Sequence, residues 1–235
     1  NTTVYGNGRY AIFIDSGSVA LRNNLIGADG GSDYCVYCNG TPLNASDYND
    51  LFVANGAYVG YYSGLVRSPL SVWKTATGKD SHSLSVAPLF VGGSDLHQRS
   101  SVSSGSYVIA SAGWTNYPGQ DSAGIDTGDP ASPYSSEPDW NGRLVNMGAY
   151  GNTLQASRAV DTDGDGLSDP FETYQYGTSS TNADMDADGF NDGGEYWAGT
   201  SPSNGNSLLE LTAVQAAAYA EGVPGQKPIS GPVPP

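Results

Sequence analysis

The sequence predicts an all-β protein in which a parallel β-solenoid is followed by a small C-terminal module of two EF-hand-like calcium loops. Three observations support this prediction. Glycine and tyrosine are abundant, with 32 and 16 of the 235 residues, and only 14% of residues are charged, a composition that favours strands and turns over helices. Short tyrosine-led runs recur at a fixed spacing near the N-terminus, and an acidic pattern occurs twice near the C-terminus.

The N-terminal repeat has a period of 24 residues. The runs 10–14, 34–38 and 58–62 each start with a tyrosine and have the composition of short strands. A unit of this size without a helix cannot bury its own apolar face, so copies of it must stack. Asn24 and Asn49 are expected at equivalent corners, where their side-chain amides would satisfy backbone groups of the turns. A β-sandwich with coincidental spacing is the alternative.

The repeat breaks after residue 67. Residues 69–77 predict a short helix that Gly78 ends and that packs Leu70 and Trp73 onto the strands. Strand character returns further along, in segments 84–91, 107–112 and 144–150.

Four short runs in this part of the chain carry a resemblance: 73–78 (Trp-Lys-Thr-Ala-Thr-Gly), 85–90 (Ser-Val-Ala-Pro-Leu-Phe), 125–130 (Ile-Asp-Thr-Gly-Asp-Pro) and 146–150 (Asn-Met-Gly-Ala-Tyr). They resemble the closing turns of bacterial right-handed parallel β-helix proteins of the pectate-lyase-like class. The resemblance covers about residues 1–155 and implies a right-handed parallel β-helix over that range. Because this class includes polysaccharide lyases, hydrolases and adhesins, the resemblance does not by itself indicate an activity.

The acidic pattern occupies residues 161–172 and again 184–195. In both windows acids stand at positions 1, 3, 5, 9 and 12, glycine stands at position 6, and an apolar residue stands at position 7. The predicted metal residues of the first window are Asp161, Asp163, Asp165, Leu167, Asp169 and Glu172, and those of the second are Asp184, Asp186, Asp188, Phe190, Asp192 and Glu195.

This spacing suits calcium, which takes about six to eight oxygen ligands from a short, sharply turned loop. The acids at positions 1, 3 and 5 supply carboxylates, the position-7 residue supplies its backbone carbonyl, and the closing glutamate binds through both oxygens, while the position-9 acid reaches the ion directly or through water. No Lys or Arg lies between Arg158 and Lys227, a span with 12 acids, so the metal-free segment should repel itself open. A solvated acidic linker is the alternative.

Each acidic window is followed by a segment that suggests a short exit helix and a Gly-Thr turn, at 172–178 and 195–200. Windows and turns together resemble thrombospondin type 3-like or dockerin-like calcium repeats, which implies two bound calcium ions. Residues 155–160 are too short for the entering helix of a full EF-hand, which puts a cohesin-binding role in doubt. The predicted division of the chain is residues 1–155 as the parallel β-helix, 156–207 as the duplicated calcium-binding loops, and 208–235 as a strand with a Pro- and Gly-rich tail.

The composition also limits the binding partners and the cellular location that can be expected for this protein. The net charge of -15 and the isoelectric point near 4.1 argue against nucleic acid or anionic membranes as partners. No run approaches the about 18 apolar residues of a membrane-spanning helix. The N-terminus lacks signal-peptide character, so we expect a mature or excised piece of an exported bacterial protein, secreted or at the cell surface. Cys35 and Cys38 form a CxxC without a second ligand pair, so buried free thiols are expected, with a local disulfide as the alternative.

The sequence predicts no catalytic residue. Neither His82 nor His97 stands in a pattern typical of a nucleophilic triad, and the cations before residue 161 form no cluster of the kind that a lyase base needs. The predicted function is a calcium-stabilised structural, adhesive or fibre-forming module of a cell-surface or extracellular assembly, whose partners are copies of itself end to end or extracellular polysaccharide. The alternative is the terminal portion of a polysaccharide lyase or glycoside hydrolase.

Overall fold

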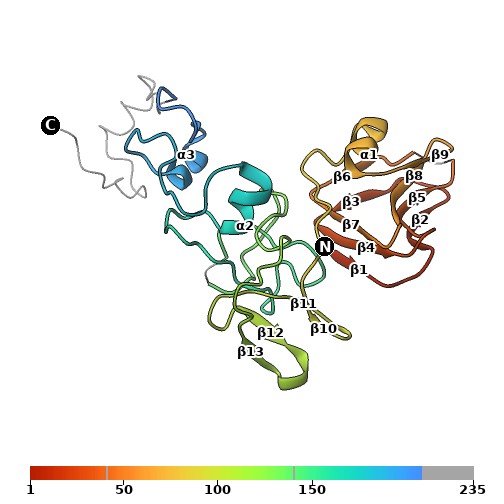
Figure 1. Ribbon diagram of the computed structural model, residues 1–235, viewed down its shortest axis with the longest axis horizontal. Coiled ribbons are helices and arrows are strands. Elements are labelled where there is room, and N and C mark those ends of the chain that lie inside the picture. The colour runs from red at the N-terminus through yellow and green to blue at the C-terminus, as the bar shows by residue number, and fades with distance from the viewer. Residues whose placement is uncertain (41, 140, 208–235) are drawn as a thin grey trace.

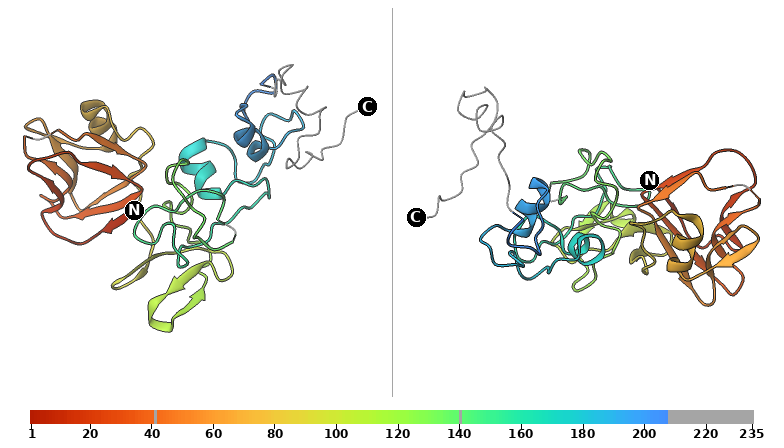
Figure 2. Two further views of the ribbon diagram at one scale, coloured as in Figure 1. Left: turned by 180° about the vertical axis from the view of Figure 1, so that it is seen from behind. Right: turned by 90° about the horizontal axis from the view of Figure 1, so that it is seen from above.

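The computed structural model describes residues 1–40, 42–139 and 141–207. The molecule is elongated, with sheets of parallel strands at one end and the acidic loops with helix α3 (Asp192–Ala198) at the other, as Figures 1 and 2 show. The predicted C-terminal strand and tail, residues 208–235, lie outside the described residues. Among the helices that are described, none is both long and apolar enough to cross a membrane.

The 24-residue repeat forms sheets of parallel strands. The three sheets are β1 (Thr2–Val4), β4 (Asn24–Asp29) and β7 (Asp50–Ala54); β2 (Tyr10–Ile14), β5 (Tyr34–Cys38) and β8 (Tyr58–Tyr62) with β9 (Leu65–Arg67) added antiparallel; and β3 (Ala20–Arg22) with β6 (Ala45–Asp47). Equivalent residues of the repeat lie opposite one another, since Tyr10 pairs with Tyr34 and Tyr34 pairs with Tyr58. The spacing of the tyrosines thus sets the strand register.

Apolar side chains from these sheets fill the space between them, because inward and outward residues alternate along a strand. The fully buried ones include Ile26, Val36, Leu51 and Val59. Helix α1 (Leu70–Thr77) adds Trp73, which is completely buried, and the helix ends at Gly78 with φ 64°. The short helix and its packing residue are therefore confirmed.

The predicted asparagine corner is present in the structure. Asn24 Nδ2 donates to Asn49 Oδ1 at 2.7 Å, and Asn49 Nδ2 donates to the carbonyl of Leu21 at 3.1 Å. The Asn49 side chain also reaches Oδ1 of the buried Asp80 at 3.2 Å. These bonds satisfy polar groups at a buried turn, where leaving them unpaired would be costly.

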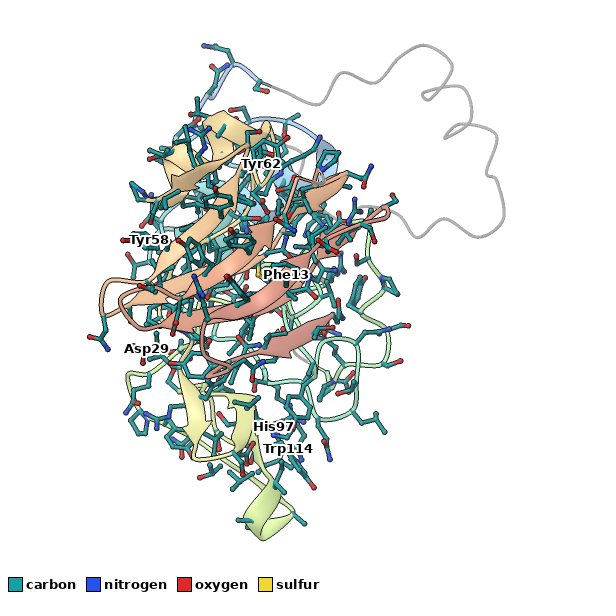
Figure 3. The ribbon with its side chains drawn as sticks, turned by 90° about the vertical axis from the view of Figure 1, so that its right-hand side faces the viewer. Phe13, Asp29, Tyr58, Tyr62, His97 and Trp114 are labelled. Carbon is teal, nitrogen blue, oxygen red and sulfur yellow. The ribbon has the colours of Figure 1, made fainter. Side chains whose placement is uncertain are left out.

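The β2–β5–β8 sheet carries aromatic rings in two columns on its outer face, where Phe13 and Tyr58 are labelled in Figure 3. In one column the rings of Phe13 and Tyr37 lie 5.5 Å apart and 11° from parallel, and those of Tyr37 and Tyr61 lie 4.5 Å apart and 4° from parallel. Neighbouring rings therefore cover one another's faces. Phe13 stands at the end of its column and is 49% exposed.

The middle of the chain is held mainly by turns and side-chain contacts. Its regular elements are two antiparallel hairpins and one 3₁₀ turn: β10 (Phe90–Gly92) with β11 (Asp95–Gln98), and β12 (Ser106–Val108) with β13 (Gly113–Thr115), joined by η1 (Ile109–Ser111). Residues 144–150, predicted to be a strand, form turns instead. Their backbone groups bond to neighbouring loops, as in the bond from the Met147 N–H to the Gly124 carbonyl at 2.8 Å.

The prediction of an all-β protein with a right-handed parallel β-helix over residues 1–155 is wrong. The described strands form five small separate sheets, and parallel pairing between named strands ends with β8. Beyond it only an isolated bridge, Asp50 to Leu84, continues the parallel direction. The physical reason is that apolar and polar residues no longer alternate regularly after Val86. The side chains there form hydrogen bonds with turns, which compete with hydrogen bonding between strands.

The C-terminal part is built around a small apolar cluster. Leu144, Leu167 and Phe171 are buried together, with Tyr176 and Tyr196 packed against them. Phe171 belongs to α2 (Asp169–Phe171), which continues as the π-helical turn η2 (Glu172–Tyr176). Because this cluster joins the first acidic window and helix α3 to Leu144, these parts are packed onto the protein rather than extended as a linker.

Candidate metal centre

The two acidic windows adopt the same local conformation. In the first, Asp161 Oδ2 accepts the Gly166 N–H at 3.1 Å, and in the second Asp184 Oδ2 accepts the Gly189 N–H at 3.0 Å. Both glycines have φ 95°, a backbone conformation that favours glycine. Each loop is thus turned inward by its first carboxylate, as its sequence spacing predicts.

Two further bonds repeat between the loops. The N–H at position 7 donates to the carboxylate at position 5, from Leu167 to Asp165 at 2.7 Å and from Phe190 to Asp188 at 2.9 Å. The carboxylate at position 9 accepts the N–H at position 2 at 2.8 Å in both loops. The two apolar residues at position 7 differ in exposure. Leu167 is completely buried, whereas Phe190 is 61% exposed.

The closing glutamates lie in helical turns that follow the loops. Glu172 begins η2 and is 0% exposed, and Glu195 lies in α3 and is 3% exposed. The side chain of Asn191 caps α3 by accepting the Gly194 N–H. An oxygen of Glu172 lies within 4.8 Å of oxygens of Asp165 and Asp192. Burial raises the pKa of Glu195, and Asp186 and Asp188 are close enough for their charges to raise that pKa further.

Many carboxylate oxygens of the loops are buried without a hydrogen-bond partner: Asp163 Oδ2, Glu172 Oε2, Asp186 Oδ1 and Oδ2, Asp188 Oδ2, Asp192 Oδ2, and Glu195 Oε1 and Oε2. A buried carboxylate without hydrogen bonds or a cation is strongly unfavourable. Residues 159–207 contain no Lys or Arg, so no side chain of the loops can neutralise them. The arrangement fits a bound cation.

Three groups of acids bring their oxygens within 4.8 Å of one another: Asp161, Asp163 and Asp165; Asp184, Asp186 and Asp188; and Asp165, Glu172 and Asp192. The third group crosses between loops. Asp165 also accepts the Gly193 N–H at 2.9 Å, which fixes the start of α3 against the first loop. The sequence did not predict that Asp192 of the second loop lies close to Asp165 and Glu172 of the first, since spacing within a loop carries no information about contacts between loops.

Asp169 and Asp192 stand at the same position of their loops but make different contacts. Both of its oxygens are occupied by Thr162, one by the N–H at 2.8 Å and the other by the hydroxyl at 2.6 Å. The equivalent Asp192 accepts one such bond, from the Met185 N–H, and keeps its other oxygen free. Asp169 therefore closes its loop, whereas Asp192 offers an oxygen to the group between the loops.

Burial and crowding raise the pKa of these carboxyls. Burial is the largest cause at Glu172, whose pKa rises to about 8, and neighbouring carboxylates such as Asp163 and Asp165 add to it. Burial likewise raises the pKa of Asp192 and Glu195, with further contributions from Asp186. Without a cation the loops would therefore take up protons, so metal binding should compete with protonation.

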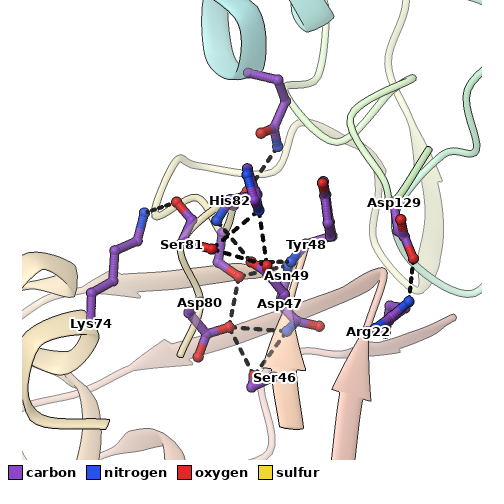
Figure 4. A network of polar contacts seen from close by, with 12 residues as sticks. Arg22, Ser46, Asp47, Tyr48, Asn49, Lys74, Asp80, Ser81, His82 and Asp129 are labelled. Atoms are coloured by element: carbon purple, nitrogen blue, oxygen red, sulfur yellow. Dashed lines mark hydrogen bonds and ion pairs between the residues drawn. The ribbon is translucent and has the colours of Figure 1, made fainter. Parts of the chain in front are cut away.

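A second polar network, shown in Figure 4, surrounds His82. His82 Nδ1 lies 2.9 Å from Asp47 Oδ2 and 3.2 Å from Ser81 Oγ. A nucleophilic triad needs the acid and the hydroxyl on opposite nitrogens of the imidazole ring, and here both contact Nδ1. His82 also stacks on Tyr48, and its carbonyl accepts the side chain of Gln175, so this network joins the sheets to η2.

The remaining candidates from the sequence are buried. Cys35 and Cys38 are buried free thiols, and burial raises their pKa to about 12 and about 11, which makes them unreactive. His97 is completely buried between two tyrosine rings, with Nδ1 2.6 Å from Asp95.

The comparisons with known proteins add no relative: no family model, no curated protein and no solved structure matches this chain. The arguments about function therefore rest on the residues and their geometry.

Proposed function

We propose that the protein binds two calcium ions, one in each acidic loop. The first ion would be held by Asp161, Asp163, Asp165, the carbonyl of Leu167 and Glu172, with Asp192 completing the set; the second would be held by Asp184, Asp186, Asp188, the carbonyl of Phe190 and Glu195. The observation that carries this proposal is the pair of buried closing glutamates with unpartnered oxygens. Oxygen donors at this spacing favour calcium over softer metals.

Calcium in this proposal has a structural role. The ions would neutralise the carboxylates and allow α2, η2 and α3 to pack on Leu144, so that the C-terminal end becomes a rigid part of the molecule. Gln175 of η2 donates to the carbonyls of His82 and Thr127 at 2.8 and 3.0 Å. A rigid loop module would therefore also brace the junction with the parallel sheets.

We infer that this calcium-stabilised protein serves as a structural or adhesive module of a bacterial cell-surface or extracellular assembly. Its proposed partners are copies of itself or extracellular polysaccharide. Support comes from the charge of -15, from loops that need a calcium-rich surrounding, and from the half-buried aromatic rings on the outer face of the β2–β5–β8 sheet. Because the rings of that sheet stack on one another, they offer a partner their edges and hydroxyls rather than open ring faces.

The calcium proposal is tested by calorimetric titration together with thermal unfolding in calcium and in excess chelator. We expect two ions per chain from the loops and a higher melting temperature with calcium, because an ion at 100 times its Kd contributes about 2.7 kcal/mol per site. The variants Glu172→Gln and Glu195→Gln should each weaken one site. Asp121→Asn is the matched control, since both oxygens of Asp121 accept bonds from Ser101. An unchanged melting curve in chelator would refute the proposal.

The assembly proposal needs a separate test. Sedimentation velocity over a range of concentrations, with and without calcium, should show self-association that calcium strengthens, or else pull-down by insoluble extracellular polysaccharide should depend on calcium. Release of reducing or unsaturated sugar ends in the same incubations would instead favour an enzyme. A calcium-loaded chain that neither associates nor binds polysaccharide would contradict the assembly role and leave the metal sites standing.

A further inference from the structure

A second acidic site lies outside the loops, in the 124–148 segment. Asp126 is 0% exposed and Glu137 is 7% exposed. Asn146 joins them: its Oδ1 accepts the Asp126 N–H at 2.9 Å, and its own N–H donates to Glu137 Oε1 at 2.9 Å. Asn146 thus holds the backbone of Asp126 and the carboxylate of Glu137 in place.

The oxygens at this site are buried and unsatisfied. Both carboxylate oxygens of Asp126, Oε2 of Glu137 and the hydroxyl of Ser168 have no hydrogen-bond partner, and Ser168 is 2% exposed. The Ser168 hydroxyl is close enough to lower the pKa of Asp126, but the two do not make a hydrogen bond of ordinary geometry. Unpartnered buried oxygens from an acid and from a hydroxyl together point to a missing ligand.

No cationic side chain fills this role in the described part of the chain. The guanidinium of Arg143 lies over the Trp197 ring, 5.7 Å from its centroid. Arg22 pairs with Asp129 rather than with Asp126. Burial raises the pKa of Asp126 well above its ordinary range and that of Glu137 to about 7, so the carboxyls must either bind a proton or receive a cation from solution.

A groove lies next to this site, and Ser168 is one of its lining residues. The groove has a volume of about 620 Å³, and Gly142, Val102 and Val160 are among its other lining residues. A Cβ atom at Gly142 would lie only 2.4 Å from Asp126 Oδ2. The backbone of Gly142, which lines the groove, therefore packs directly against the carboxylate of Asp126, which is itself fully buried.

We propose that Asp126, Glu137 and Ser168 bind a third cation, a hard divalent ion such as calcium, beside this groove. All the donors are oxygens, as hard cations require, and the two carboxylates balance a charge of two. Ser168 follows Leu167 in the first acidic loop, so the ion would tie the 124–148 segment to that loop. None of these three residues is among the proposed ligands of the two loop ions.

The test is the calcium stoichiometry of the full chain, measured by equilibrium dialysis with elemental analysis of the protein compartment. We expect one more ion than the loops bind, and we expect Asp126→Asn to bind one ion fewer than the wild type. Ser168→Ala, which removes only a hydroxyl, should weaken one ion by about tenfold or more, and Glu137→Gln should do the same. Asp121→Asn should bind as many ions as the wild type.

The loop variants separate this site from the proposed function. With Glu172→Gln and Glu195→Gln combined, two ions should bind more weakly and one should keep its affinity, and adding Asp126→Asn should remove that one. If the loops bind no calcium at all, the wild type would still bind one ion. An Asp126→Asn protein that keeps the wild-type ion count would show that Asp126 is simply protonated and would overturn the proposal. If that variant does not fold, Ser168→Ala and Glu137→Gln decide by the same criterion, and unchanged binding in both refutes the site.

Discussion

The two ends of the molecule are both built from a repeated sequence, but they are held together by opposite means. At the N-terminal end the repeat returns every 24 residues, and at the C-terminal end the acidic window returns after 23. The first repeat stacks apolar side chains and pairs backbone groups between copies. The second buries carboxylates that lack partners. The first repeat is stabilised by contacts between its own copies. The second brings together carboxylates whose charge a cation must balance.

The largest expected effect comes from removing calcium, because two ions are lost from the same end of the molecule. In excess chelator the amides of residues 161–199 should exchange with deuterium at least about 100-fold faster, since each lost ion removes about 2.7 kcal/mol at 100 times its Kd. Strands β5 and β8 should keep their protection. Hydrogen exchange with mass spectrometry measures both ends in one experiment. Equal loss at both ends would mean that the comparison is wrong and that the parts unfold as one.

A substitution in the core of the parallel sheets tests the other end of the molecule. Trp73→Ala should destabilise the parallel sheets by about 3–5 kcal/mol, because it leaves a cavity and removes the indole bond to Asp80 at 2.7 Å. Urea unfolding, followed in calcium and in chelator, should show the same loss in both. Trp197→Ala is the control, since Trp197 is 43% exposed, and it should cost about 0.5 kcal/mol or less. A loss for Trp73→Ala that appears only in chelator would contradict the separation of the two ends.

A smaller effect distinguishes the two position-9 acids. Asp192→Asn should weaken calcium binding by about 10- to 100-fold, as changes to supporting metal residues do, because Asp192 Oδ2 is free to face Asp165 and Glu172. Asp169→Asn should change affinity much less, since Thr162 occupies both oxygens of Asp169. Calorimetric titration of both variants is the measurement. Equal losses would show that each acid serves only its own loop.

The smallest effect concerns pH and the sheets. Asp50 is 1% exposed, and burial raises its pKa from 3.8 to about 7. Because the folded pKa exceeds the unfolded one, the stabilisation is complete below about pH 4 and is lost as pH rises toward 7. In chelator, the protein should be more stable at pH 5 than at pH 8. Asp50→Asn should flatten this dependence in urea titrations at the two pH values, whereas an unchanged pH dependence would assign it to other acids.

Parts of the fold could be predicted because local rules govern them. The tyrosine period set the register of β2, β5 and β8, and the sequence Pro69 to Gly78 set the ends of α1. The extension of parallel strands to residue 155 was wrong, because short apolar runs after residue 84 also suit turns. In the loops, glycine and acid spacing predicted the conformation of both windows, since these bonds join residues only a few positions apart.

The sequence by itself determined the register of the repeat, the helix that covers it and the shape of each acidic loop, because each depends on contacts between near or equivalent positions. Only the tertiary structure decided that Asp192 lies close to Asp165 and Glu172 of the other loop, whereas Thr162 bonds to both oxygens of Asp169. It also decided that Asp126 and Glu137 are buried around Asn146 beside a groove. Burial and long-range neighbours set the charge of a carboxyl, and neither can be obtained from spacing along the chain.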